Sequence, residues 1–302
     1  MKVLILHSLP PSVVDEGRSP AELDLGLAVA ALAEVLPEAT VAGVRGEVQE
    51  VLELLSLHKP DVVFNACEAP LGRPDREAHV AALLEWLGIR FTGSGSETLA
   101  LCRRKDRMNA VLEASGVAIP RSNVFPCIVK PADQDGSIGL DADSVCENEW
   151  AVARARARIP GPVVIQEFLP GREFAVSLWG RLEPEFVSVG EFGFREGLRL
   201  NTYASKWDVQ SVEYARSPIS SIRPDTDQSM LDEVIATARG AWRAAEARGY
   251  IRVDVRLDAS GMPRALDVNP NPEITPGVGI NRAVIEAGWT WAEFVRKQIE
   301  WA

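Results

Sequence analysis

The sequence has few cysteines, no long apolar run and fewer basic than acidic residues. Its 302 residues include four cysteines, Cys67, Cys102, Cys127 and Cys146, with no Cys-x-x-Cys pair among them. This spacing argues against a zinc site and predicts reduced, mainly structural thiols in a cytoplasmic protein. The longest apolar stretch, Leu25–Ala33, is far shorter than the roughly 20 residues that a transmembrane helix needs, so we expect no membrane contact.

The charge balance is acidic, with 32 Lys and Arg residues against 43 Asp and Glu residues and a net charge of −11. Nucleic-acid binding needs a basic surface that this composition does not supply, so we expect small-molecule substrates and no nucleic-acid partner. The hydrophobic fraction of 46% and the charged fraction of 25% are typical of a globular chain. The length suggests about two domains.

Strands and helices alternate in the first part of the sequence. The predicted strands are Val3–His7, Val41–Val44 and Asp61–Asn65, and the predicted helices are Ala21–Leu36, Glu47–Leu57 and Glu77–Leu87. This alternation predicts a parallel sheet covered on both faces, with ligands bound beyond the carboxyl ends of its strands. Candidate contacts for a first substrate at these ends are His7, Ser8, Asn65, Glu68 and Glu77. Alternatively, Asn65 and Glu68 only cap the end of their strand.

A break of small residues at Arg90–Gly95 predicts a domain boundary. Beyond it, the spacing predicts one continuous helix over Glu97–Ser115. The other elements predicted before the last hairpin are Cys127–Lys130, Glu147–Arg158, Val163–Phe168, Glu173–Leu178, Glu185–Val189 and Asp227–Arg248.

Two further strands, Tyr250–Leu257 and Pro263–Asn269, form a predicted hairpin around a short loop that contains glycine. A turn centre between Ser260 and Gly261 fixes the register of the two strands. One face of this hairpin is apolar and is expected to be core; it carries Ile251, Val253, Val255, Leu257, Leu266 and Val268.

The opposite face of the hairpin is polar, with Arg252 opposite Asn269 and Asp254 opposite Asp267. Two carboxylates that lie directly opposite each other repel, and a divalent cation between them removes that repulsion. Magnesium is commonly held by one or two carboxylates together with substrate phosphates. A magnesium site is therefore one interpretation. The other is a polar face in water, in which the arginine pairs the carboxylates.

Lys130 ends an apolar strand, and a glycine-containing loop follows at Asp135–Gly139. A lysine at the end of a buried strand is costly unless its ammonium group meets an anion, and the N–H groups of such a loop can hold phosphate oxygens. The loop matches neither the Walker A pattern nor the dinucleotide fingerprint. A plain turn after an edge strand is the alternative.

The strand Val163–Phe168 runs into a connection that leads to Glu173. Exposed backbone in this connection can hydrogen-bond an adenine, and the carboxylate of Glu173 can accept from ribose hydroxyls. The alternative is a β-turn with a solvent-facing Glu173.

Several segments occur together in a characteristic order: FTGSG, CRRKDRMNAVLEASGVAIPRS, VKPADQDGSIG, VIQEFLPGREFAV and RVDVRLDASGMPRALDVNPNPEIT. This order resembles the ATP-grasp superfamily, and within it the D-alanine–D-alanine ligase-like branch. The resemblance implies an α/β and α+β fold with a Rossmann-like parallel-sheet domain over 1–92. ATP would lie between two α+β lobes, a central one over 93–180 and a C-terminal one over 181–302. It also implies that a carboxylate receives the γ-phosphoryl group of ATP and that an amine attacks the acyl phosphate, with release of ADP and phosphate.

The resemblance implies roles for individual residues. The cofactor site would comprise Lys105, Lys130, Gly136, Ser137, Ile138, Gly139, Gln166, Glu167, Phe168, Leu169, Glu173 and Lys206. Asp254, Asp267 and Asn269 match the ligands of two magnesium ions, which manganese can replace. The residues implied in catalysis are Arg252, Lys206 and Ser137, with the guanidinium of Arg252 stabilising the tetrahedral intermediate. A homodimer is also implied.

The sequence departs from the family pattern at the amino-acid subsites. Trp207 stands where the family has tyrosine, and Gln166 and Asp267 each stand where glutamate is usual. Val278 and Gly279 stand where the family has a Ser-Leu pair that binds the carboxylate of the second substrate. We therefore expect a ligase for an amino acid or small peptide other than D-alanyl-D-alanine. Its candidate substrate contacts are His7, Asn65, Glu68, Trp207, Gly277, Val278 and Gly279.

Two other functions are compatible with this nucleotide site: a kinase that stops at phosphoryl transfer, and a non-catalytic ATP-binding module. Six residues together argue against the module: Arg252, Asp254, Asp267, Asn269, Lys105 and Lys130. A binding module has no evident need for an arginine that stabilises an intermediate.

Overall fold

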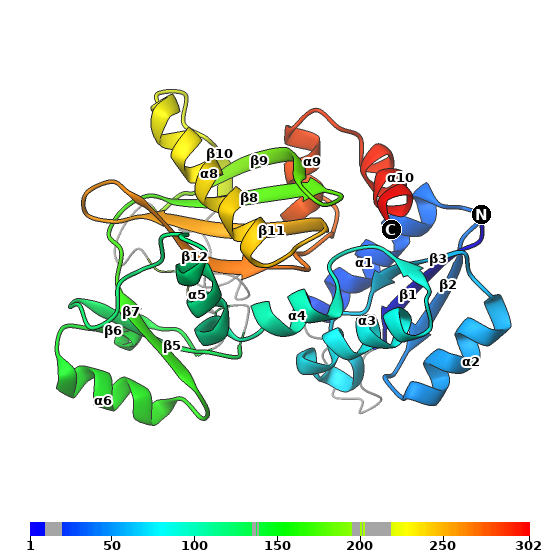
Figure 1. Ribbon diagram of the computed structural model, residues 1–302, viewed down its shortest axis with the longest axis horizontal. Helices are drawn as coiled ribbons and strands as arrows, with labels where there is room; N and C mark the ends of the chain where they lie inside the picture. The colour runs from blue at the N-terminus through cyan, green and yellow to red at the C-terminus, as the bar shows by residue number, and fades with distance from the viewer. Residues whose placement is uncertain (10–19, 135–136, 138, 195–199, 201, 203–218) are drawn as a thin grey trace.

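Among the residues that it describes, the computed structural model contains three β-sheets. The sheet of β1–β4 lies at the right of Figure 1, and the other two sheets lie one above the other to its left. The structure describes residues 1–9, 20–134, 137, 139–194, 200, 202 and 219–302. No helix in these ranges is long and apolar enough to cross a bilayer.

The first sheet is parallel, with the strand order β2-β1-β3-β4. Its strands are β1 (Val3–Ser8), β2 (Thr40–Val44), β3 (Val62–Ala66) and β4 (Arg90–Phe91), and its helices are α1 (Pro20–Val35), α2 (Val48–His58) and α3 (Glu77–Trp86). Short 3-10 turns at Pro70–Gly72 and Pro74–Arg76 precede α3. The predicted parallel sheet is confirmed, and β4 adds a strand where the sequence indicated only a break.

The alternation of side chains along β1 divides the core of this sheet into two faces. Leu4 and Leu6 pack with side chains of α2 and α3 on one face. Ile5 points to the other face, where it meets Leu32 of α1 and residues of the last helix, α10 (Trp291–Trp301). The first sheet is therefore covered on both faces.

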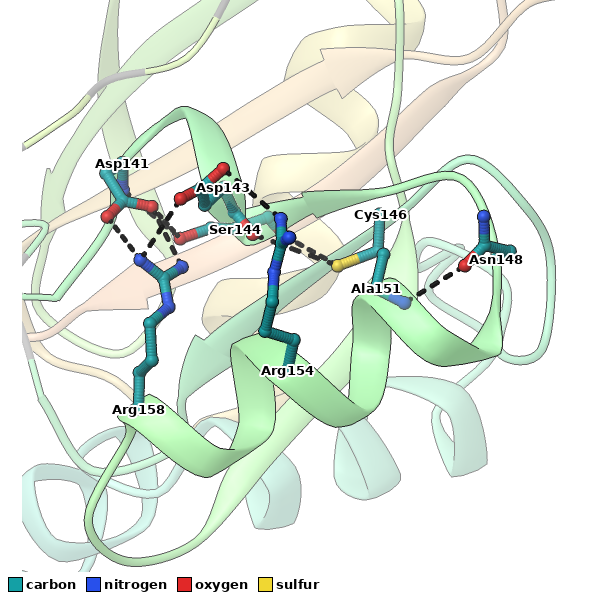
Figure 2. Close-up of polar contacts among 8 residues, drawn as sticks. All are labelled: Asp141, Asp143, Ser144, Cys146, Asn148, Ala151, Arg154 and Arg158. Carbon is teal, nitrogen blue, oxygen red and sulfur yellow. Dashed lines mark hydrogen bonds and ion pairs between the residues drawn. The ribbon is translucent and has the colours of Figure 1, made fainter.

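The second sheet is antiparallel, with the strand order β6-β5-β7. Its elements are β5 (Cys127–Pro131), a 3-10 turn (Ala142–Ser144), β6 (Val145–Cys146), α6 (Glu149–Arg158) and β7 (Val163–Glu167). Figure 2 shows contacts at the two ends of α6. The side chain of Asn148 caps its start by accepting from the N–H group of Ala151 (3.0 Å), and Arg158 in its last turn binds the carboxylate of Asp141 (2.7 Å). All four cysteines of the chain are buried free thiols, as the sequence predicts.

The predicted helix Glu97–Ser115 consists of two helices, α4 (Ser96–Cys102) and α5 (Lys105–Ala114). The backbone of Arg104 is extended, with φ −109° and ψ 91°, and this interrupts the helical conformation. The N–H group of Lys105 then donates to a carbonyl oxygen just beyond β5 (2.8 Å). The break therefore places Lys105 at the start of α5, next to the second sheet.

The third sheet is antiparallel, with the strand order β10-β9-β8-β11-β12. Its strands are β8 (Glu173–Gly180), β9 (Pro184–Phe192), β10 (Ile219–Ser221), β11 (Gly249–Leu257) and β12 (Pro263–Asn269), and α8 (Gln228–Ala244) and α9 (Gly279–Glu286) accompany it. Side chains of α5 and α8 bury one face of this sheet. The domain boundaries at 92/93 and 180/181 stay predictions. β8 hydrogen-bonds to β9 and β11 within the third sheet, and α10 packs on the first sheet.

The β11–β12 hairpin has the predicted register at its polar end, where the pairs are Arg252 with Asn269 and Asp254 with Asp267. Near the loop the strands pair differently, with Val255 opposite Ala265. A β-bulge beside Asp254 absorbs this difference. The predicted turn centre between Ser260 and Gly261 is therefore wrong, because the pairs next to the loop are centred on Ser260.

Leu266 is the extra residue of this bulge. The sequence predicts a core position for it, but Leu266 is half-buried and lines a pocket, whereas its neighbour Ala265 is fully buried. An inserted residue shifts the alternation of the side chains between the two faces on one side of it. An expectation based on uninterrupted alternation does not include this shift.

Asp258 stabilises the loop of the hairpin. Its carboxylate accepts from the N–H groups of Ser260 (2.9 Å) and Met262 (3.0 Å) and from the guanidinium of Arg264 (2.8 Å). Burial alone would raise the pKa of Asp258, but these donors hold it well below its usual range. We predict that Asp258→Ala lowers the free energy of unfolding by about 2 kcal/mol, because hydrogen bonds to a charged group contribute about 1.5–3 kcal/mol.

Chemical denaturation measures this effect, with the exposed Asp225→Ala as control. Because the folded-state pKa of Asp258 is depressed, its contribution is complete above the unfolded-state pKa of about 3.9 and decreases as the pH falls toward the folded-state pKa. A stability difference that is the same at pH 7 and pH 2 would contradict this assignment.

Candidate active site

An open pocket lies between the second and third sheets. Residues of β5 and β7 line one side, and residues of β8, β11 and β12 line the other. Among the residues expected from the sequence, those that line it are Lys105, Lys130, Ser137, Gln166, Glu167, Phe168, Leu169, Glu173, Arg252, Asp254, Asp267 and Asn269. Groups that are far apart in the sequence therefore meet in one place.

The remaining expected residues lie elsewhere. Gly136, Ile138, Lys206 and Trp207 are outside the described residues. The described residues that do not line this pocket are His7, Asn65, Glu68, Gly139, Gly277, Val278 and Gly279. Gly139 has a φ of 76° and packs near the ring of Pro131.

Asp254 and Asp267 face each other across the hairpin, and each contacts a cation. Arg252 donates to the carboxylate of Asp254 through Nε (2.7 Å) and Nη2 (3.0 Å), and Nζ of Lys105 lies 3.1 Å from Oδ2 of Asp267. Burial opposes the charge of Arg252, but the carboxylates of Asp254, Asp267 and Glu273 raise its pKa. The pairing of arginine with a carboxylate, which the sequence left open beside the metal interpretation, is present in the structure.

The polar side chains of the hairpin fit a magnesium ion. Asp254, Asp267 and Asn269 present carboxylate and amide oxygens, which Mg²⁺ prefers, and Mg²⁺ is usually completed by phosphate oxygens and water. Within the described residues, no group of three or more His, Cys, Asp or Glu side chains is arranged to hold a metal by itself. The donor set therefore suits an ion that shares its coordination with a phosphate ligand.

Two ammonium groups lie close to these carboxylates. Nζ of Lys130 donates to the carbonyl oxygen of Leu266 (3.3 Å), and Lys105 is only 7% exposed. Burial lowers the pKa of Lys130, while the carboxylate of Asp267 acts in the opposite direction and Lys105 lowers it further. A phosphate group between the two lysines would favour the charged form of both.

Arg121 fixes the segment that follows β7, a contact that the sequence analysis missed. Its Nε and Nη2 donate to the carboxylate of Glu167 (2.7 and 2.6 Å), which lowers the pKa of Glu167. The N–H groups of Glu167 and Phe168 donate to the carbonyl oxygens of Arg121 and Pro126 (both 2.8 Å). These two N–H groups are therefore engaged within the protein. No local pattern around Arg121 indicates its distant partner.

Glu173 is buried, at 5% exposure, so the alternative of a solvent-facing side chain is wrong. Its carboxylate accepts from Nη1 of Arg256 (3.1 Å), and the guanidinium of Arg256 lies 5.2 Å from the ring centre of Phe168. The sequence analysis also missed Arg256. The period-two run of Arg252, Asp254 and Arg256 on one strand face was the signal that could have indicated it.

The expected first-substrate residues lie at the carboxyl edge of the first sheet. Oδ1 of Asn65 accepts from the N–H group of Cys67 (3.3 Å), which is the capping contact that the sequence left as an alternative. Nδ1 of His7 lies 3.0 Å from the carbonyl oxygen of Ser8. Glu68 is half-buried at the same edge.

Glu77 connects this edge to the end of the hairpin. Its Oε1 accepts from Nδ2 of Asn271, and Oδ1 of Asn271 also accepts from the hydroxyl of Tyr250 (3.3 Å). The N–H group of Asn271 donates to Oδ1 of Asn269, a predicted metal ligand (3.1 Å). The carboxyl edge of the first sheet and the β11–β12 hairpin are thus joined by hydrogen bonds.

The backbone requires glycine at the start of α9. Gly279 has a φ of 50°, and a Cβ atom there would lie 2.1 Å from the carbonyl oxygen of Glu273. Beside it, Val278 is 43% exposed, and the N–H group of Gly277 donates to Oδ1 of Asn281 (2.8 Å). This close approach gives a structural reason for glycine at a position where the resembled family has a larger residue.

Comparison with known proteins adds to this geometry. The family model described as "D-ala D-ala ligase C-terminus" matches residues 98–300. The chain belongs to this family. Among curated proteins, it is 29% identical over 248 residues to the uncharacterized protein y4sG of Sinorhizobium fredii, covering 78% of this chain and 72% of that protein. It is 26% identical over 284 residues to the D-alanine–D-alanine ligase of Ruegeria pomeroyi, covering 86% and 87%.

Solved structures share the fold. The D-alanine–D-alanine ligase of Bacillus anthracis complexed with ATP has a TM-score of 0.74 at 16% identity and covers 99% of this chain and 96% of its own. The D-alanyl-alanine synthetase A of Vibrio cholerae has a TM-score of 0.74 at 17% identity, with coverages of 99% and 98%. The predicted ATP-grasp fold and the D-alanine–D-alanine ligase-like enzyme class are confirmed.

Proposed function

We propose that the protein is an ATP-dependent carboxylate–amine ligase that forms a peptide or amide bond through an acyl phosphate and releases ADP and phosphate. We further propose that its substrates are amino acids or small peptides other than a pair of D-alanines. The observation that carries the proposal is the meeting of Lys105, Lys130 and Arg252 with the paired carboxylates of Asp254 and Asp267 in one pocket.

This arrangement suits phosphoryl transfer, in which catalysis consists mainly of positioning and charge stabilisation. Lys105 and Lys130 would bind phosphate oxygens and orient the γ-phosphoryl group toward a substrate carboxylate. Asp254, Asp267 and Asn269 would hold Mg²⁺, which when bound neutralises phosphate charge. Attack of an amine on the acyl phosphate places negative charge on the former carbonyl oxygen. The guanidinium of Arg252 would stabilise that charge.

The substrate part of the proposal is supported by the segment at the start of α9. Val278 has no side-chain hydrogen-bonding group, and Gly279 is required by the backbone. A substrate carboxylate bound there without polar side-chain partners would lose hydrogen bonds that it makes in water, which is unfavourable. A substrate that does not present a carboxylate at this place avoids that loss.

The proposal is tested by nucleotide turnover with Mg²⁺ across a panel of single and paired amino acids and dipeptides. ADP and AMP are resolved, and the products are searched by mass. We expect ADP and phosphate only with particular pairs, together with a product mass equal to their dehydrated sum. A stable phosphorylated acceptor would instead indicate a kinase, and AMP would contradict the reaction. Efficient condensation of two D-alanines would contradict the substrate assignment alone.

A further inference from the structure

Asn271 lies two residues beyond Asn269, the last residue of β12. The ladder between β11 and β12 ends at Asn269, so strand pairing does not hold the chain beyond it. The N–H group of Asn271 donates to Oδ1 of Asn269 (3.1 Å). This hydrogen bond orients the side chain of a predicted metal ligand, and a carbonyl oxygen has a second lone pair with which to bind an ion.

The side-chain amide of Asn271 has partners in two distant parts of the fold. Nδ2 donates to Oε1 of Glu77, the first residue of α3, which covers the first sheet. Oδ1 accepts from the hydroxyl of Tyr250 on β11 (3.3 Å). An ionised carboxylate only accepts hydrogen bonds, so the amino group of the amide must face Glu77 and its oxygen must face Tyr250.

Tyr250 is suited to donate this hydrogen bond. It is 1% exposed, and burial together with the carboxylates of Glu68 and Glu77 raises its pKa. The phenol therefore keeps the proton that it donates to Asn271. The amide is held on both sides, and this fixes the place from which the backbone of Asn271 contacts Asn269.

We propose that Asn271 is a positioning residue that connects the first sheet to the metal site and holds Asn269 in the geometry that binds the ion. The inference rests on the proposed function in one respect, that Asn269 is a ligand of Mg²⁺. The backbone of Asn271 orients Asn269, and its side chain fixes that backbone against α3 and β11. Replacing a group that orients a metal ligand typically lowers metal affinity or activity about 10–100-fold.

The connection also relates two parts of the proposed site. The carboxyl edge of the first sheet carries the predicted contacts for a first substrate, and Asn269 lies at the predicted metal. Phosphoryl transfer requires reacting atoms that lie about 3–3.5 Å apart. A fixed link from α3 to the metal ligand would help to maintain that geometry.

The experiment titrates Mn²⁺ into protein held in excess over a non-hydrolysable ATP analogue, and the relaxation rate of water protons reports the bound ion. Asn271→Leu is similar in size but has no hydrogen-bonding group in its side chain. We expect it to raise the Kd of Mn²⁺ at least about tenfold, although the backbone N–H group is still present. Asn269→Ala is the reference and should raise the Kd at least as much.

Variants of Glu77 separate the hydrogen bond from the charge. Glu77→Gln loses the charge but keeps an oxygen that accepts from Nδ2 of Asn271, whereas Glu77→Leu loses both. We therefore expect a higher Kd of Mn²⁺ in Glu77→Leu than in Glu77→Gln. That difference should disappear when residue 271 is leucine, because the two side chains act through one contact.

A matched control is Ser94→Ala. Ser94 is 2% exposed, and its hydroxyl donates to the carbonyl oxygen of Arg248 (3.2 Å), a hydrogen bond between the segment after β4 and the residue before β11. It does not line the pocket. The free energy of unfolding is measured for every variant. Ser94→Ala should lower it without changing the Kd of Mn²⁺, as a purely structural contact does.

An unchanged Kd of Mn²⁺ in Asn271→Leu, with or without a loss of stability, overturns the positioning role and leaves the ligase proposal standing. A rise of equal size in Ser94→Ala does the same. An unchanged Kd in Asn269→Ala, or a folded wild type that binds no Mn²⁺ with the nucleotide, overturns the metal assignment of the proposed function as well.

Discussion

Replacing Arg252 with alanine should lower the rate of product formation about 10²–10³-fold while ATP still binds. Arg252 holds the carboxylate of Asp254 through two hydrogen bonds and faces the pocket with a charge that nearby carboxylates maintain. Removing one group that stabilises developing negative charge typically lowers kcat by about 10²–10³-fold. The measurement is kcat for the condensed product beside the Kd of ATP, because the expected loss is in turnover and not in nucleotide affinity.

Two further variants sharpen this test. Arg252→Lys keeps the charge but loses the planar fork, so it should retain only part of the activity. Arg223→Ala removes an exposed arginine that pairs with Glu191 away from the pocket, and its turnover should equal that of the wild type. Unchanged turnover in Arg252→Ala would contradict the proposal that this guanidinium stabilises the intermediate.

Replacing Asp267 with asparagine should raise the Mg²⁺ concentration needed for half-maximal turnover and lower kcat about a hundredfold or more, since a hard cation prefers a charged oxygen ligand. Asp267 is also the partner of Lys105, 3.1 Å away, so the substitution weakens a contact of a phosphate-binding residue as well. The measurement is turnover as a function of Mg²⁺ concentration, and of Mn²⁺ in parallel.

The control for Asp267→Asn is Asp232→Asn on the exposed side of α8, where the carboxylate accepts from Gln228 (2.8 Å). It should keep the Mg²⁺ dependence of the wild type. If Asp267→Asn also kept that dependence and lost only kcat, Asp267 would act through Lys105 and not through a metal.

The polar pairs of the β11–β12 hairpin were predictable because side chains alternate strictly along a strand. Asp254 and Asp267 therefore lie on one face in the predicted register and in every register that differs from it by an even number of residues. The turn centre was wrong, but the bulge beside Asp254 compensates for the error at the site. Leu266 was misassigned for the same reason, since a bulge leaves no clear trace in a hydrophobic pattern.

Other features depend on contacts between distant parts of the chain. The helix break before Lys105 follows from a hydrogen bond to the segment beyond β5, although the helical spacing continues through it. Arg121 and Arg256 acquire their roles only when Glu167 and Glu173 are placed beside them by the second and third sheets. A single sequence shows which residues can pair, and the fold decides which of them do.

The packing of α10 on the first sheet has a consequence for the order in which the protein can be assembled on the ribosome. Phe64 and Ile5, near the start of the chain, share a core with Phe294, Val295 and Ile299 near its end. The first sheet is synthesised before α10, so this face lacks much of its apolar cover until α10 emerges. We expect the nascent first sheet to expose apolar surface until then and to depend on chaperones more than its simple parallel topology suggests.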